Sequence, residues 1–492
     1  MTVNFNNIVK IMSIIFLVLG FSIIPALLVA CIYKEQAAVI GFSNAFVLSL
    51  CIGFVFYKMY QPEKLKLKER DGYLIVTLCW IFSSLLGALP YCLSGAIPNL
   101  ADAFFESCSG FSTTGATILI DIEAMPKSLL FWRSFTQWLG GIGIILFATT
   151  FLPSSGIGGQ KNINKESYGP TLSKRDHLFS DMTQNIFLLY LLFTFIEILL
   201  LMLGGMQLFD AVTHTFSTVS TGGFSPYNDN LDHFDLLLNS SYVQWVIIVF
   251  MILSGMNFNL YFLVFKKGLK SLLKDSEFKL YTILIAAVSL LVFLSVYFGG
   301  YYGRIGKALA DSAFQVVSFI TTTGFTTCNY DLWPTFCKML LLILAITGAC
   351  TVSIGGGVKL IRVLIGLKMV RRGVSLKLHP NRYVPVTIGS KEIPQEAATN
   401  VVNYIFLYIF VIFFGAVLIS IDGNDLVTTL SSVITCVSNV GLGFNQVGPG
   451  LSYHFYSDFS KMVLSFLMIA GRLELFSFFM LFSSHYWNTN KV

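Results

Sequence analysis

The chain is poor in charged residues. Asp, Glu, Lys and Arg together make up 12% of its 492 residues, whereas an ordinary soluble domain carries about 25%. Hydrophobic residues make up 55% of the chain, and its mean hydropathy is +0.73. This composition excludes most soluble proteins and favours a chain that lies in a lipid bilayer.

Groups of residues typical of catalytic or metal sites are also lacking. The six His residues are scattered, no phosphate-binding glycine loop is present, and the nine Cys residues lie mostly in apolar runs rather than in a disulfide pattern. An enzyme acting within the membrane would need a cluster of acids or metal ligands, and Glu197 alone in its apolar run provides neither. We therefore expect neither an enzyme nor an organic cofactor.

Ten apolar runs of about twenty residues are each long enough to cross a bilayer as a helix. Strands of a membrane barrel are disfavoured because they would alternate polar and apolar residues. The predicted spans are 11–33, 37–57, 73–93, 129–152, 186–206, 243–265, 280–300, 338–362, 401–421 and 462–487. The predicted fold class is an all-α polytopic membrane protein with ten transmembrane helices.

Most of the 32 Lys and Arg residues fall on one side of this ten-span arrangement. Basic loops mark the cytoplasmic side, so we expect both termini there and no nucleic-acid partner for the net charge of +6. The opposite face would carry many of the acids, which would raise the local cation concentration. Among them are Asp102, Glu106, Asp210, Asp311 and Asp425.

A short motif occurs four times, each time between two predicted spans. In the first three copies an Asp precedes a Gly by thirteen residues. These pairs are Asp102 and Gly115, Asp210 and Gly223, and Asp311 and Gly324, and a fourth, similar copy ends at Gly441. A single Ser/Thr/Gly stretch is usually only a loop, so the evidence lies in the repetition.

Each copy is too short to cross the membrane. About eleven helical residues rise only about 16 Å, against a hydrocarbon core of about 30 Å. The Asp suits a helix N-cap at the outer end, and the Thr and Gly residues that follow disfavour a helix. We therefore expect four short helices that enter the membrane and four loops that return, lining one shared cavity.

The chemistry of these loops suits a monovalent cation. Loop carbonyls and hydroxyls can replace its hydration shell, and the short helices direct their partly negative C-termini to the same place. No loop carries a carboxylate, so K⁺ is favoured over Ca²⁺ or Mg²⁺, and Asn439 and Val440 make the fourth loop different. The predicted filter residues are Thr113, Thr114, Gly115, Thr221, Gly222, Gly223, Thr322, Thr323, Gly324, Asn439, Val440 and Gly441.

The chain also contains the stretches 131–143, 355–359 and 471–474, and two spans ahead of the first repeat. With the four loops and these features, the chain resembles the Trk/Ktr/HKT superfamily of cation transporters. It is most similar to the membrane subunit of bacterial Trk potassium uptake systems. The resemblance implies a pseudo-fourfold pore in the bacterial cytoplasmic membrane, a homodimer, and a cytosolic nucleotide-binding regulatory subunit of the TrkA type. Members with Ser at the first filter glycine tend to admit Na⁺, so Gly115 implies K⁺ selectivity.

The resemblance divides the chain into five units. An N-terminal two-helix extension covers 1–70, and the four repeats cover 71–182, 183–278, 279–397 and 398–492. The pore loops are 102–118, 210–226, 311–327 and 428–444, and the second helix of the third repeat is broken at 345–357.

Two features indicate a gate on the cytoplasmic side. Arg472 lies within the last span, where placing a cation in the membrane costs about 2.5 to 3.5 kcal/mol. The resemblance implies that Arg472 projects into the pore as a barrier, as its family counterpart does. The alternative is an ion pair with Glu474, which a separation of two residues on a helix disfavours. Small residues interrupt the eighth span, where the family has a flexible intramembrane loop and where the alternative is a helix-packing face. The candidate gating residues are Arg472, Gly348, Thr351, Ser353, Gly355, Gly356 and Gly357.

The sequence leaves two questions open. A Na⁺-coupled or Na⁺-conducting transporter of the same fold is the alternative to a K⁺ uptake protein. The sequence also does not separate channel-like permeation from ion-coupled transport.

Overall fold

The computed structural model describes residues 5–60, 69–151, 172–236, 240–389 and 391–483. Within these ranges the chain is mainly helical, and the one sheet among them is a two-residue antiparallel pair, β1 (Thr387–Ile388) and β2 (Lys391–Glu392). The prediction of an all-α chain of membrane type is confirmed.

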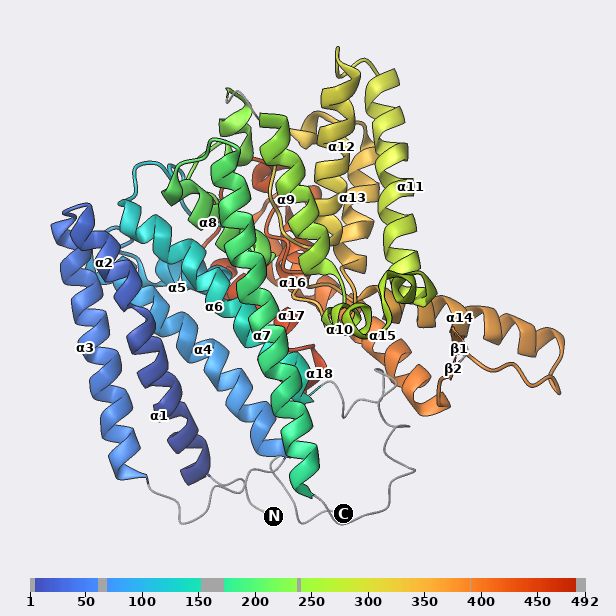
Figure 1. Ribbon diagram of the computed structural model, residues 1–492, viewed down its shortest axis with the longest axis horizontal. Coiled ribbons are helices and arrows are strands. Elements are labelled where there is room, and N and C mark those ends of the chain that lie inside the picture. Colours follow the sequence, from blue (N-terminus) through green and yellow to red (C-terminus); the bar gives the residue numbers. More distant parts are fainter. Residues whose placement is uncertain (1–4, 61–68, 152–171, 237–239, 390, 484–492) are drawn as a thin grey trace.

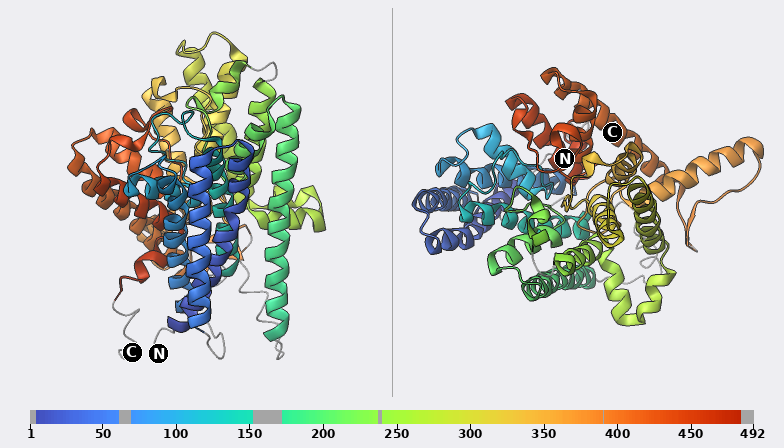
Figure 2. Two further views of the ribbon diagram at one scale, coloured as in Figure 1. Left: turned by 90° about the vertical axis from the view of Figure 1, so that its left-hand side faces the viewer. Right: turned by 90° about the horizontal axis from the view of Figure 1, so that it is seen from above.

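The long helices form most of the bundle in Figure 1. They are α1 (Phe5–Ser22), continued by α2 (Ile24–Ile32), α3 (Gln36–Met59), α4 (Glu69–Leu93), α6 (Lys127–Phe151), α7 (Leu172–Leu203), α11 (Ser276–Phe298) and α15 (Gln395–Ile419). Four shorter helices lie between them, namely α5 (Leu100–Phe111), α8 (Leu208–Val219), α12 (Ile305–Ile320) and α16 (Leu426–Val437). Seen from above, successive segments of the chain follow one another around a common centre (Figure 2).

Three of the predicted spans are interrupted. The first becomes α9 (Ser240–Gly255) and α10 (Phe258–Lys267), the second α13 (Thr335–Thr347) and α14 (Leu360–Leu378), and the third α17 (Asp458–Arg472) and α18 (Phe476–Met480). Short 3₁₀ helices occur as well, among them η3 (Asn230–Leu236) and η4 (Leu269–Lys274).

The structure does not confirm the prediction of ten spans, of which only the eighth was expected to be broken. In the part of the chain that the structure describes, six helices are long and apolar enough to cross a membrane, or seven if the bent pair α9 and α10 is one span. The span predicted at 243–265 bends by 92°, because the Asn257 side chain accepts a hydrogen bond from Asn259 N (3.0 Å) and caps a new helix. The span predicted at 462–487 stops at Arg472, close to Glu474 with its left-handed backbone (φ +52°); its end, 484–487, lies outside the described residues.

Helix α6 passes directly across the end of α5. A Cβ atom at Gly140 would lie closer than 3.0 Å to the Phe111 carbonyl oxygen, so only a glycine allows this approach. Trp132, also on α6, is fully buried and donates a hydrogen bond to the Gly87 carbonyl of α4 (3.1 Å). The end of α5 is thereby fixed between two long helices.

We expect Gly140→Ala to lower the thermal stability of the purified protein. The added methyl group overpacks the crossing of α5 and α6, which costs about 1–3 kcal/mol. Gly143→Ala on the same helix is the matched control, because a Cβ there meets Trp80 at an ordinary 3.8 Å. Equal melting temperatures for the two variants in detergent would contradict the close crossing.

Candidate functional site

The four segments that follow the short helices share one backbone conformation. In each, a residue other than glycine has a positive φ, and a glycine two positions later has a positive φ as well. The pairs are Thr113 (+50°) and Gly115 (+86°), Thr221 (+54°) and Gly223 (+79°), Thr322 (+59°) and Gly324 (+79°), and Asn439 (+55°) and Gly441 (+83°). Because this region disfavours side chains, its occurrence at four equivalent places indicates a common structure.

These segments touch one another in a closed ring. A Cβ atom at any of the four glycines would lie closer than 3.0 Å to a carbonyl oxygen of the next segment. The contacts run from Gly115 to Gly222, from Gly223 to Thr323, from Gly324 to Val440, and from Gly441 back to Thr114. The structure thus brings all four groups of predicted filter residues together at one place.

The ring has the chemistry of a cation site. All of the predicted filter residues except Gly115 are buried, and their backbone and hydroxyl oxygens gather where α5, α8, α12 and α16 end. The C-terminus of a helix carries partial negative charge. Such an arrangement can replace the water around a monovalent cation.

Polar side chains hold the segments in different ways. Asn439 Nδ2 donates to Thr114 Oγ1 (2.8 Å) and to the Met468 carbonyl (3.0 Å), so it ties the fourth segment to the first. Gln137 of α6 donates to the Gly222 carbonyl (2.6 Å) and accepts from Phe224 N (3.2 Å). The four segments therefore share a backbone conformation, whereas the side chains that hold them differ from one segment to the next.

A buried ion pair that the sequence did not reveal lies behind the first two segments. Arg133 Nε donates to Glu106 Oε1 at 2.7 Å, and both side chains are inaccessible. Glu106 also accepts from Thr117 Oγ1 and from Ile118 N (3.0 Å). Arg133 donates in addition to the Ser225 carbonyl (3.2 Å), so the pair joins the exits of the first and second segments.

The Asp residues of the first three motifs are not helix caps, contrary to the sequence prediction. Asn99 caps α5, and Asp102 is buried one turn further on, paired with Lys461 at 2.5 Å. Asp210 accepts from the Tyr227 hydroxyl (3.0 Å). Of these four helices, only α16 has an Asp as its N-cap. Asp425 accepts hydrogen bonds from backbone N–H groups in its first turn.

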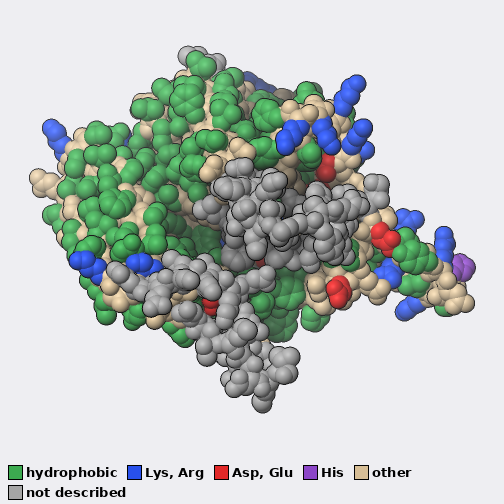
Figure 3. Space-filling view, turned by 60° about the horizontal axis from the view of Figure 1, so that its bottom comes forward, with side chains coloured by type: hydrophobic (Ala, Val, Ile, Leu, Met, Phe, Trp, Pro, Cys, Tyr) green, Lys and Arg blue, Asp and Glu red, His purple; other side chains and the backbone are tan. Residues whose placement is uncertain are grey.

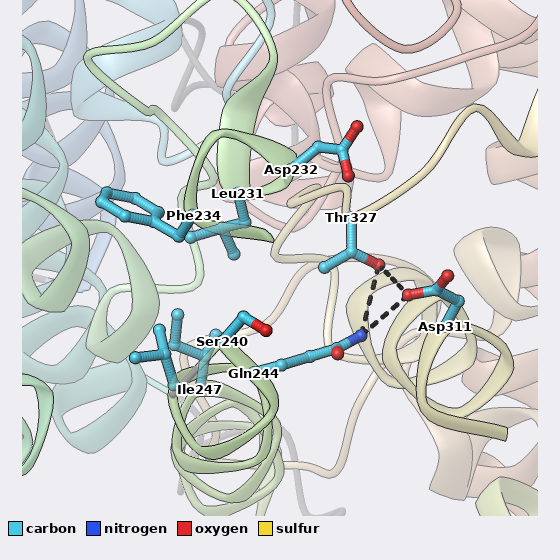
Figure 4. Close-up of a pocket in the computed structure, with 9 residues that line it drawn as sticks. Leu231, Asp232, Phe234, Ser240, Gln244, Ile247, Asp311 and Thr327 are labelled. Atoms are coloured by element: carbon cyan, nitrogen blue, oxygen red, sulfur yellow. Dashed lines mark hydrogen bonds between the residues drawn. The ribbon is translucent and has the colours of Figure 1, made fainter. Parts of the chain in front are cut away.

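The third carboxylate lies well inside α12. Gln244 of α9 and Thr327, which follows the third segment, both donate to Asp311 Oδ1 at 2.9 Å (Figure 4). Asp102, Asp210 and Asp311 are buried, and each has a hydrogen-bond or ion-pair partner within the protein. These acids therefore hold the short helices in place and do not form the acidic surface that the sequence suggested.

Exposed acids do occur where the first and second segments leave the ring. Asn228 accepts from Ile122 N (2.7 Å) and donates to Asp121 Oδ1 (2.9 Å). The hydrogen bond from Asn228 lowers the pKa of Asp121. This loop carboxylate therefore stays ionised into acid solution and can attract cations.

The non-helical segment between α13 and α14, residues 348–359, packs against the ring. Gly356 N donates to Thr322 Oγ1 (2.6 Å), and a Cβ at Gly356 would overlap the Ser438 carbonyl. Glycine is also required at Gly348 and Gly357, which approach each other with positive φ. We call residues 348–359 the intramembrane segment.

Arg472 joins this segment to the ring. Its guanidinium donates to the carbonyls of Ser112, Thr113 (3.1 Å) and Ile354 (2.6 Å). Glu474 pairs instead with Arg362 at 2.6 Å, so the alternative of an Arg472–Glu474 ion pair is wrong. Arg472 is buried without an acidic partner among the described residues.

A cavity lies between the intramembrane segment and the ends of α14 and α17. Three basic side chains and one acidic side chain are among its lining groups. They are Lys359, Arg362, Arg472 and Glu474, and Thr351, Ser353, Gly355, Gly356 and Gly357 line it as well. All the candidate gating residues except Gly348 thus border one positively charged cavity next to the ring.

Comparison with known proteins gives a consistent result. The sequence matches the TrkH family, described as "Cation transport protein", over residues 38–489. It is 34% identical to the Trk system potassium uptake protein TrkH of Salmonella typhimurium, covering 98% of this chain and 99% of that protein. It is 33% identical to TrkG of Escherichia coli, covering 96% of each. The crystal structure of the potassium transporter TrkH from Vibrio parahaemolyticus is similar, with a TM-score of 0.89, 32% identity, and coverage of 99% of this chain and 100% of that chain.

We expect Arg133→Ala to destabilise the protein by about 3–5 kcal/mol, because it leaves the Glu106 carboxylate buried without its cation. Lys338→Ala is the control: its ion pair with Asp331 (3.1 Å) is partly exposed, and such pairs contribute about 0–1 kcal/mol. Thermal denaturation in detergent measures both. If both variants melted at the same temperature, the ion pair would not support the ring.

Proposed function

The chain belongs to the TrkH family of cation transport proteins, and from this we propose that it takes up K⁺ through a filter formed by its four loop segments. The observation that carries the proposal is the closed ring of glycine and carbonyl contacts. A single cation on the axis of such a ring meets oxygens from four directions. The names of the relatives and of the similar crystal structure support K⁺ as the ion.

In this proposal the filter consists of the twelve residues predicted from the sequence, and the four segments belong to four helix–loop–helix units after a two-helix extension. The units need not coordinate equally. Gly222 shares its carbonyl with Gln137, and Asn439 turns its amide toward Thr114. Selectivity would then rest on the backbone oxygens that all four segments provide.

Control of permeation is proposed for the cytoplasmic side of the ring. The intramembrane segment lies against the ring there, and Arg472 contacts both. A guanidinium beneath the filter repels cations. Arg362 in the same cavity is neutralised by its ion pair with Glu474, so Arg472 forms most of this barrier. Opening would require the segment and Arg472 to move away from the axis.

The proposed setting is the bacterial cytoplasmic membrane, with both termini in the cytoplasm. The sequence supports this orientation through its basic loops. The family resemblance supports a homodimer and a cytosolic nucleotide-binding regulatory subunit of the TrkA type. That subunit would supply the energy or signal for opening, since the sequence contains no nucleotide-binding motif.

The direct test is cation flux through purified protein in liposomes, with K⁺, Rb⁺ or Na⁺ gradients imposed one at a time. We expect K⁺ and Rb⁺ to pass and Na⁺ to pass poorly. Gly223→Ala should abolish this preference, because its methyl group displaces the Thr323 carbonyl. Gly205→Ala is the control: it also has a positive φ (+97°), but nothing lies within 4 Å of its Cβ position.

Equal K⁺ and Na⁺ flux in the unmodified protein would favour the Na⁺-conducting alternative. Unchanged selectivity in Gly223→Ala would contradict the ring as the filter. A loss of selectivity in both variants would point to backbone strain, rather than the displaced Thr323 carbonyl, as the cause.

A second prediction concerns Arg472. We expect Arg472→Ala to raise K⁺ flux without any partner, since each 1.4 kcal/mol or so of barrier removed increases the rate about tenfold. Arg472→Lys keeps the charge and loses most of the hydrogen bonds to Ser112, Thr113 and Ile354. If charge forms the barrier, the Lys variant stays closed; Arg472→Ala flux equal to that of the unmodified protein would rule the barrier out.

A further inference from the structure

The bend after α9 produces a segment unlike the rest of the bundle. Helix α10 turns by 92° from α9 and continues into η4. Figure 2 shows both, in yellow-green, extending sideways from the long helices. The ends of α9 and α11 enclose this segment, so it lies at one end of these two helices rather than along them (Figure 1).

This segment, residues 258–274, is both basic and apolar at its surface. Four of its side chains are exposed lysines, and residues 256–274 contain no Asp or Glu. The lysines are Lys266, Lys267, Lys270 and Lys274. Phe265, Leu269 and Leu273 lie between them with exposed fractions of 77%, 72% and 65%.

The opposite face of the segment is fixed to the protein. Phe258 is buried, and its ring lies 6.5 Å from that of Phe193 on α7. The Tyr261 hydroxyl donates to the Leu253 carbonyl at 2.7 Å. These contacts anchor the start of α10, and the exposed lysines and apolar side chains follow it.

We propose that residues 258–274 bind the headgroups of anionic phospholipids at the inner surface of the membrane. Exposed apolar side chains interleaved with lysines, on a helix that lies across the bundle, suit the boundary between acyl chains and headgroups. Lysines at this depth attract anionic lipid, and the segment has no acid to oppose them. A space-filling view of this end of the molecule shows Lys and Arg side chains in groups at the edge of a hydrophobic surface (Figure 3).

The first residue of 258–274 and two residues that flank this segment are hydrogen-bonded to the intramembrane segment. Cys350 N donates to the Gly255 carbonyl (3.1 Å), and Phe258 N donates to the Val352 carbonyl (3.2 Å). Thr351 donates through its backbone N (2.6 Å) and its hydroxyl (2.7 Å) to Glu277, near the start of α11. Lipid bound to 258–274 would therefore act on residues 350–352 through Phe258 and through the flanking Gly255 and Glu277.

The inference rests on the cytoplasmic orientation proposed above but not on K⁺ transport. It is tested by titrating the purified full chain with phosphatidylglycerol or phosphatidylcholine and counting bound lipids by native mass spectrometry. Replacing Lys266, Lys267, Lys270 and Lys274 by Gln should weaken phosphatidylglycerol binding by about tenfold or more and leave phosphatidylcholine unaffected. The matched variant with four Arg residues should bind as the original chain does.

A second measurement follows amide hydrogen exchange of residues 348–356. Phosphatidylglycerol should slow exchange there in the original chain and in the Arg variant, but not in the Gln variant. Equal phosphatidylglycerol binding by the Gln variant, or equal binding of the two lipids, would overturn the proposal. The proposal would also fail if the cytosolic regulatory subunit, and not lipid, slowed exchange of residues 348–356. Residues 258–274 would then be a protein docking site. Neither measurement involves ion flux, so failure here is separate from failure of the proposed function.

Discussion

The approach of four backbone segments to one another at a single place determines much of this structure. Each segment contributes a glycine whose missing side chain makes room for a carbonyl oxygen of the next segment. A methyl group at any of these positions would enter space already filled, and the positive φ adds strain to it. The ring is closed by contact, so its diameter is set by the backbone and not by the side chains. That brings backbone carbonyl oxygens of all four segments around one place, as the proposed cation filter needs.

A ring of this kind places many polar groups where water is scarce, and the protein satisfies them unequally. The Glu106–Arg133 pair serves the first two segments, Asn439 links the fourth to the first, and Thr322 receives Gly356 N of the intramembrane segment. An unpaired charge at such a depth costs several kcal/mol, which the Glu106–Arg133 pair avoids. Not every polar group is satisfied, since the Asn439 side-chain oxygen has no hydrogen-bond partner among the described residues. Because different side chains support the four segments, these segments could diverge in sequence while their backbones stayed alike.

These differences explain which features the sequence could predict. The four loop segments that meet in the ring could be located because Thr and Gly recur at a fixed spacing, and backbone conformation depends on such local patterns. Arg472 was recognised because a cation in an apolar run is costly. The supports of the ring depend on distant pairings, such as Lys461 with Asp102, that no local pattern encodes. The bend at Gly255–Asn257 was missed for another reason: the apolar run continues through it, and only the cap on Asn257 and the hydrogen bonds of the intramembrane segment reveal it.

The helix breaks are related to one another in space. Groups freed where α9 ends, Gly255 O and Phe258 N, bond to Cys350 N and Val352 O, which are freed where α13 ends. Arg472, where α17 ends, donates to Ile354 of the same segment. Backbone N–H and C=O groups freed by a helix break within a membrane must find hydrogen-bond partners in the protein. Here the freed groups of one break bond to those of another. Moving the intramembrane segment therefore removes partners from α9, α10 and α17 together, so displacement of one part favours displacement of the others. A cooperative change of this kind is what a gate needs, and it follows from the hydrogen bonding of the breaks rather than from any single residue.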